Sequence, residues 1–208
     1  MLRTLFIALL VVGCFFEWAY LRYTRSEYYL YSTLRRKNLP YQEAFSRLKR
    51  AVEINPNAGL ARMHYSRLLM EQRRYLDAWE QATRAHETFH SINTYKQLGS
   101  IDLQNQNLND ARRNFTKVTT LKPFDLQAME RLFLIEYRTG HFTEAAMWLN
   151  KLDQVFPQNF NNAYFRGLLL QELRRPAEAR QAFEKASKMR PVYGNEPLFN
   201  ADQVRRQI

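Results

Sequence analysis

Five alanines recur along this chain at a nearly constant spacing. They lie 34, 33, 34 and 34 residues apart, at Ala44, Ala78, Ala111, Ala145 and Ala179. Four prolines keep the same phase, at Pro56, Pro123, Pro157 and Pro191. His90 stands where a fifth proline would fall. A period near 34 is the length of one helix–turn–helix unit in a stacked helical array. The spacing therefore predicts an all-α solenoid, an architecture that builds binding surfaces.

The residues around each alanine follow the period of an amphipathic helix. In the segment 75–85 the apolar positions are Tyr75, Ala78, Ala82 and Ala85, which is the i, i+3, i+7, i+10 stripe. A small residue in this stripe lets a second helix approach closely. An acidic residue precedes the alanine at Asp77, Asp110, Glu144 and Glu178. Carboxylates there lie in the first turn, where they interact favourably with the helix N-terminus. In four of the five units a following proline is expected to stop the helix.

These repeated residues resemble the tetratricopeptide repeat (TPR) family over about residues 25–193. The resemblance implies a right-handed superhelix of paired helices whose first helices line a concave groove. We expect about five repeats, at 25–58, 59–91, 92–125, 126–159 and 160–193. The remaining segments are an N-terminal helix in residues 1–24 and a tail, 194–208, in which Asn200 is expected to begin a capping helix.

The N-terminal segment is strongly apolar. An unbroken apolar run extends from Leu5 to Phe16, and with Glu17 as an interruption it continues to Leu21. The 17 residues from Leu5 to Leu21 are at the lower limit of what spans a bilayer. Trp18 and Tyr20 lie where an interfacial aromatic belt is expected. The pattern favours a single signal-anchor helix.

Two further questions about this segment stay open at the level of sequence. Val12-Gly13-Cys14 resembles a lipobox, so an outer-membrane lipoprotein assembly factor (pilotin-like) anchored at Cys14 is the alternative. Arg3 favours an N-terminus that stays inside, whereas Arg22 and Arg25 favour the opposite. A short basic start before an apolar run is the usual export signal, so we predict an inner-membrane, single-pass protein with periplasmic repeats.

The chain is basic throughout. It has 31 Lys and Arg against 20 Asp and Glu, a formal charge of +11. Such a balance attracts anionic surfaces, but the basic residues are scattered along every repeat. Scattered charge favours solubility and non-specific attraction, so no nucleic-acid partner is expected. The single cysteine, Cys14, excludes an intrachain disulfide.

One short motif suggests metal chemistry. His86, Glu87 and His90 read H-E-x-x-H, in which two imidazoles on one helix face bind zinc and the glutamate acts as general base. The motif falls in the last turn of an expected repeat helix, and no third ligand is evident downstream. A zinc metallopeptidase is thus a weak alternative, and we predict a non-enzymatic protein without metal or cofactor.

The expected groove is the stronger candidate for a binding site. By the repeat register its lining residues are Tyr29, Arg67, Lys96, Gln104, Arg131, Tyr137, Arg138, Tyr164 and Gln171. Tyrosine and arginine often anchor interfaces, and this set suits a peptide of acidic character. The lysine, arginine and asparagine pattern of TPR co-chaperones is not kept, so a carboxylate clamp is not expected. The sequence predicts a membrane-tethered adaptor that holds a protein partner in a multiprotein envelope complex.

Overall fold

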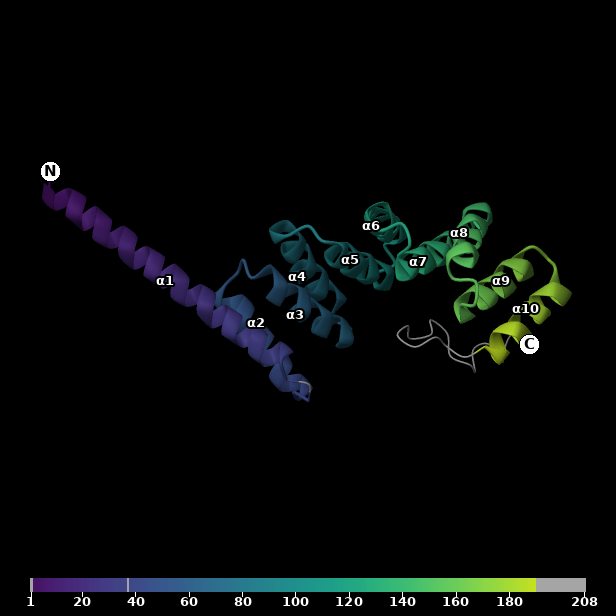
Figure 1. Cartoon of the computed structure of the whole chain (residues 1–208), viewed down its shortest axis with the longest axis horizontal. Helices are drawn as coiled ribbons and strands as arrows, with labels where there is room; N and C mark the ends of the chain where they lie inside the picture. Colours follow the sequence, from purple (N-terminus) through teal and green to yellow (C-terminus); the bar gives the residue numbers. More distant parts are fainter. Residues whose placement is uncertain (1, 37, 190–208) are drawn as a thin grey trace. The chain divides into compact units, whose positions relative to one another are not determined.

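The computed structural model describes the backbone of residues 2–36 and 38–189, and side chains from residue 11 onward. The described residues form ten helices and no strand, which confirms the all-α prediction (Figure 1). The helices are α1 (Leu2–Leu34), α2 (Tyr41–Ile54), α3 (Gly59–Glu71), α4 (Tyr75–Thr88), α5 (Ile92–Gln104), α6 (Leu108–Leu121), α7 (Leu126–Arg138), α8 (Phe142–Val155), α9 (Phe160–Glu172) and α10 (Pro176–Lys188). The predicted capping helix and Pro191 lie outside the described residues.

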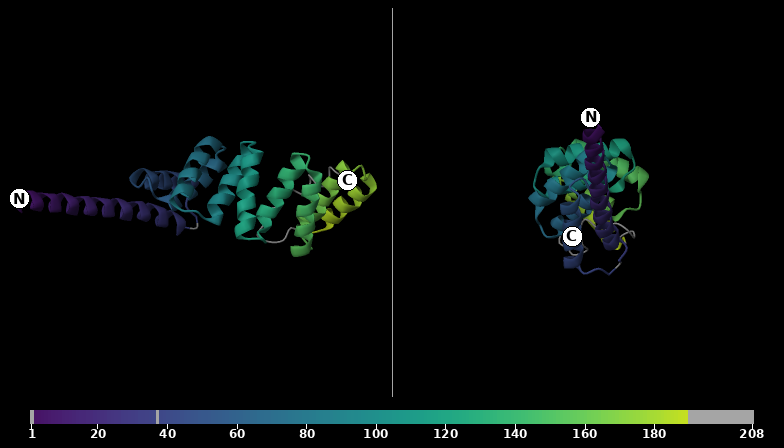
Figure 2. Two further views of the ribbon diagram at one scale, coloured as in Figure 1. Left: turned by 90° about the horizontal axis from the view of Figure 1, so that it is seen from above. Right: turned by 90° about the vertical axis from the view of Figure 1, so that its left-hand side faces the viewer.

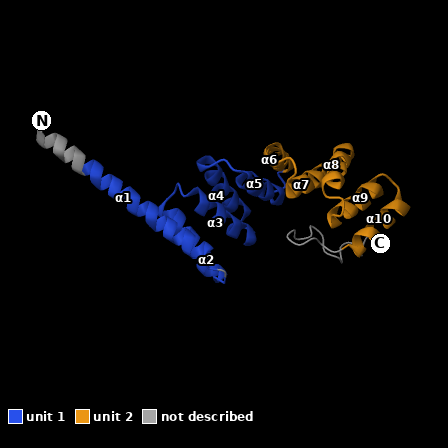
Figure 3. Ribbon diagram, in the orientation of Figure 1, with its two compact units in different colours: residues 1–107 blue, residues 108–208 orange. Residues whose placement is uncertain are grey.

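The chain divides into two compact units, which are coloured separately in Figure 3. Unit 1 is Met1–Asn107 and contains α1 to α5. Unit 2 is Leu108–Ile208 and contains α6 to α10. The division falls inside the repeat expected at 92–125. Within unit 1, α1 packs on α2 and α3 packs on α4; within unit 2, α7 packs on α8 and α9 packs on α10.

The first helix is longer than the predicted anchor. α1 continues without a break from Leu2 to Leu34, so the boundary expected at residue 24 does not interrupt it. Within unit 1, the first half of α1 projects past the other four helices, α2, α3, α4 and α5 (Figures 1 and 2). Its second half packs on α2, where the Ser26 hydroxyl donates to the Ala51 carbonyl at 2.9 Å. Within the segments searched, no helix has the length and apolarity needed to cross a membrane.

The repeated alanines lie where helices meet. Ala78, Ala111 and Ala145 are fully buried, and Ala179 is 2% exposed. Ala44 differs, because it is only partly buried at the edge of the unit 1 core. A methyl group at these positions lets the paired helix approach without leaving a cavity.

The helix ends do not depend on proline alone. α2 and α8 end two residues before a proline, and the residue between leaves the helical conformation, as a following proline favours: Asn55 has φ −126° and ψ 96°, and Phe156 has φ −131° and ψ 63°. α4 ends at Thr88, which is likewise two residues before the repeat position of the proline, although His90 occupies that position here. Phe89 is extended there with φ −149° and ψ 124°, so the repeat keeps its break without the proline.

The two units fill their cores differently. In unit 1 the core is mainly alanine and leucine around Leu48, Leu69 and Ala82. In unit 2 the rings of Phe133 and Phe165 stack with their centroids 4.2 Å apart. Gly167 makes room for a third ring, because a Cβ there would lie 2.4 Å from Phe183. The absence of a side chain at Gly167 on α9 thus lets the Phe183 ring of α10 pack closely against this helix.

Candidate functional site

One face of unit 2 brings together polar and aromatic side chains from α7 and α9. The Tyr137 hydroxyl donates to Glu172 Oε1 at 2.9 Å, and the Tyr137 ring stacks on Phe133. Burial raises the pKa of Tyr137 to about 12, and the hydrogen bond and charge of Glu172 act in the same direction. Tyr137 is therefore a neutral hydrogen-bonding group at physiological pH, fixed in place by a neighbouring helix.

A buried carboxyl group lies on the same two helices. Glu130 is 4% exposed, and its Oε1 accepts hydrogen bonds from Asn161 at 2.7 Å and from Asn159 at 3.4 Å. Burial raises the pKa of Glu130, while these hydrogen bonds and the charge of Arg131 oppose the rise. The expected groove set did not include Glu130 or Asn161, because their contact joins α7 to α9 and no local sequence pattern indicates it.

Arg131 is the cation nearest to this carboxyl group in sequence. Its guanidinium is half-buried, and burial lowers its pKa, opposed by Glu130 and assisted by the positive charge of Arg138. The Nε atom of Arg131 has no hydrogen-bond partner within the described part of the chain. Arg138, two turns further along α7, is exposed. The α7 face therefore offers two cations, one of which holds an unused donor.

The structure divides the nine predicted groove residues between the two units. Tyr29, Arg67, Lys96 and Gln104 lie in unit 1, on α1, α3 and α5. Arg131, Tyr137 and Arg138 lie on α7, and Tyr164 and Gln171 on α9, all in unit 2. Arg67, Gln104, Arg138 and Gln171 are exposed. Tyr164 is only 4% exposed and packs on Phe183, so its ring belongs mainly to the core.

The H-E-x-x-H motif does not keep the geometry that zinc binding needs. α4 ends at Thr88, so His90 lies beyond the helix that should carry both imidazoles. The His86 ring packs against those of His90 and Tyr95, and its Nδ1 lies 3.0 Å from Thr94 Oγ1. Among the side chains described, no group of three or more His, Cys, Asp or Glu residues could hold a metal ion. The motif thus finds no third ligand there.

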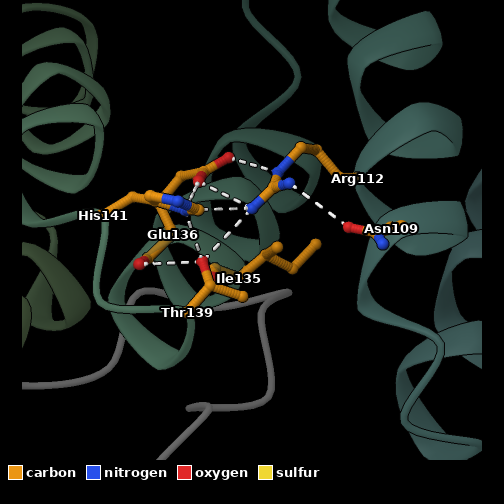
Figure 4. A network of polar contacts seen from close by, with 6 residues as sticks. All are labelled: Asn109, Arg112, Ile135, Glu136, Thr139 and His141. Atoms are coloured by element: carbon orange, nitrogen blue, oxygen red, sulfur yellow. Dashed lines mark hydrogen bonds and ion pairs between the residues drawn. The ribbon is translucent and has the colours of Figure 1, made fainter.

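A second polar cluster joins α6 to the turn between α7 and α8 (Figure 4). Arg112 donates to both carboxylate oxygens of Glu136, from Nε at 2.7 Å and from Nη2 at 2.9 Å. Arg112 also donates to Thr139 Oγ1 at 3.2 Å, and His141 Nδ1 lies 3.2 Å from Glu136 Oε2. Both oxygens of the buried Glu136 carboxylate therefore accept hydrogen bonds from within the protein. We interpret the cluster as a brace between repeats.

Comparison with known proteins identifies the repeats. Two tetratricopeptide repeat models match the chain, one over residues 96–160 and one over residues 161–193. A comparison with curated proteins gives no match.

Several solved structures share the fold at low sequence identity. MamA (residues 41 to the end) from Desulfovibrio magneticus RS-1 has a TM-score of 0.69 at 16% identity, covering 78% of this chain and 93% of its own. PilF of Pseudomonas aeruginosa has a TM-score of 0.65 at 18% identity, covering 80% and 77%. YrrB, described as a TPR protein with an unusual peptide-binding site, has a TM-score of 0.62 at 16% identity, covering 74% and 79%. The chain therefore contains tetratricopeptide repeats and has the helix-pair fold of TPR proteins.

Proposed function

We propose that this chain is a non-enzymatic adaptor that binds a protein partner through the α7–α9 face of unit 2. The observation that carries the proposal is Arg131, whose Nε is buried and has no hydrogen-bond partner in the described chain, on the helix that also carries Tyr137 and Arg138. A buried donor without an acceptor costs free energy, which a ligand that supplies the acceptor would recover. Two arginines and a fixed tyrosine suit an acidic peptide segment, since arginine binds carboxylates strongly.

We further propose that α1 tethers the adaptor to the inner membrane of a bacterial envelope, with the repeats in the periplasm. The support is the exposed apolar surface of α1, which includes Phe15, Phe16 and Leu21 at 59–67% exposure. Arg22 lies over the Trp18 ring at 4.4 Å, a pairing suited to the interface between lipid and water. Arg22 also donates from Nε to the Ile54 carbonyl at 2.7 Å, which ties α2 to α1 near this level.

The partner proposal is tested by affinity purification of the full chain in mild detergent with identification of the co-purified proteins. Arg138→Glu should abolish recovery of the specific partner, because it reverses the charge of the proposed face. Arg180→Glu on α10 is the matched control, since Arg180 is exposed in the same unit and forms an ion pair within its own helix. Equal recovery with both variants would reject this face as the binding site.

The anchoring proposal is tested by fractionation and by a reporter fused to the C-terminus. A periplasm-active reporter and membrane recovery of the chain support the signal anchor. Cys14 is exposed on α1, so lipoprotein processing is the competing outcome. Palmitate labelling that disappears in Cys14→Ser would establish the lipoprotein instead.

A further inference from the structure

A buried arginine in unit 1 forms no ion pair with any residue that the structure describes. Arg62 on α3 is 3% exposed. Its Nε donates to the Pro56 carbonyl at 2.6 Å, and its Nη1 donates to Gln81 Oε1. Both acceptors are neutral, and no carboxylate of the described chain lies within ion-pair distance of this guanidinium. Buried charges in proteins are normally paired or bound to a ligand of opposite charge.

The repeat register shows that packing does not require a charge at this place. The positions 33, 67 and 101 residues further along the chain hold Tyr95, Met129 and Ala163. These equivalents are apolar or aromatic, and the α7–α8 and α9–α10 pairs pack with Met129 and Ala163 at this position. An arginine kept here, at the cost of burying its charge, indicates a role other than filling the core.

Arg62 lines a cleft that contains a second arginine. The cleft has a volume of about 570 Å³, and its lining residues are Pro56, Asn57, Arg62, Arg84, Glu87 and Thr88. Burial lowers the pKa of Arg62 and the positive charge of Arg84 lowers it further, whereas the negative charges of Glu80 and Glu87 oppose the shift. Glu80 pairs with Arg84 at 2.8 Å, and Glu87 contributes one carboxylate to the cleft lining. The two guanidinium groups therefore repel each other across a space that water or an anion can enter.

We propose that this cleft binds a small tetrahedral oxyanion of the phosphate type. The donors that line it come from three segments: Asn57 from the α2–α3 connection, Arg62 from α3 and Arg84 from α4. Donors converging from several segments match the oxygens of a tetrahedral anion better than a planar carboxylate. A phosphate also carries more negative charge than a carboxylate and accepts strong hydrogen bonds from guanidinium groups. The site is independent of the partner-binding face proposed for unit 2.

The test is calorimetric titration of the full chain, in mild detergent, with inorganic phosphate at an ionic strength held constant with sodium chloride. We expect saturable binding of one phosphate per chain. Arg84→Gln should weaken this binding about tenfold or more, the usual effect of losing a hydrogen bond between charged groups. Glu87→Gln should tighten it about two- to fivefold, because it removes a competing negative charge at the rim.

Arg50→Gln is the matched control, since Arg50 is an exposed arginine of unit 1 on α2, outside the cleft. It should leave the affinity unchanged. All three variants alter exposed side chains, so the test does not depend on a substitution at the buried Arg62. Absence of saturable binding, equal weakening by Arg84→Gln and Arg50→Gln, or equally tight binding of acetate would each overturn the proposal.

Discussion

Two buried charges, one in each unit, are held in opposite ways. In unit 2 Glu136 is 6% exposed, and Arg112 holds it through two hydrogen bonds. In unit 1 Arg62 is 3% exposed and contacts only neutral acceptors. Both charges lie on the first helix of a repeat, within the same architecture. The difference separates a charge that braces the fold from one that remains able to bind an anion.

The largest expected effect is the loss of the matched pair in unit 2. Arg112→Ala leaves Glu136 buried without its cation, and we expect the free energy of unfolding to fall by about 2–3 kcal/mol. The value is below that for a fully buried pair because the Arg112 side chain is 29% exposed. Urea denaturation followed by circular dichroism measures the change.

A double variant checks the cause of this loss. Adding Glu136→Gln to Arg112→Ala removes the unpaired charge and should restore most of the lost stability. If the double variant is no more stable than Arg112→Ala, the brace acts through packing and the comparison with Arg62 fails.

The second effect concerns the different cores. Gly167 in unit 2 faces Phe183. The equivalent repeat positions in unit 1, 101 residues earlier, hold Ser66 in place of Gly167 and Ala82 in place of Phe183. Gly167→Ala forces a methyl group into the Phe183 ring, and we expect a loss of about 1–3 kcal/mol. In a Phe183→Leu background, Gly167→Ala should lower the free energy of unfolding by less than it does in the wild type. Denaturation of the wild type, both single variants and the double variant measures this difference. A cost that is the same in both backgrounds would exclude the contact as its cause.

The sequence predicts the helices well because their signals are local. α3, α5, α7 and α9 begin at residues 59, 92, 126 and 160, the first residues of four expected repeats. The polar contacts were not predicted, because Arg112 and Glu136 are 24 residues apart and meet only through the packing of α6 on α7.

The sequence pattern also does not predict the direction of individual side chains. Tyr164 was expected on a binding face, but its ring packs into the core against Phe183. For Arg62 a signal existed in the sequence: a charge stands where the equivalent repeat positions hold Tyr95, Met129 and Ala163. Comparing repeats position by position thus identifies exceptions that the average pattern hides.

The third prediction concerns the pH dependence of stability in unit 2. The pKa of Glu130 is raised in the folded state, chiefly by burial. Folding therefore favours the protonated form, and the associated stability is present below the unfolded pKa and lost as pH rises through the folded pKa. Glu130→Gln keeps the acceptor for Asn161 and removes the charge. It should raise stability near pH 7 by up to about 1 kcal/mol and leave it unchanged near pH 4.

Denaturation of the wild type and Glu130→Gln at both pH values measures this difference. A constant difference at the two pH values would mean that the carboxyl group does not titrate between them.

The smallest effect compares one turn from each unit. The turn between α3 and α4 places Arg73 at φ 60°, and the turn between α7 and α8 places Gly140 at φ 77°. Glycine adopts this left-handed conformation without steric cost, whereas other residues lose about 1 kcal/mol or more. Arg73→Gly should therefore stabilise unit 1 by about 0.5 kcal/mol, after the entropy that glycine loses on folding, and Gly140→Ala should destabilise unit 2 by about 1 kcal/mol. Changes of the same sign in the two variants would show that contacts of the turn side chains, and not backbone conformation, decide the stability of these turns.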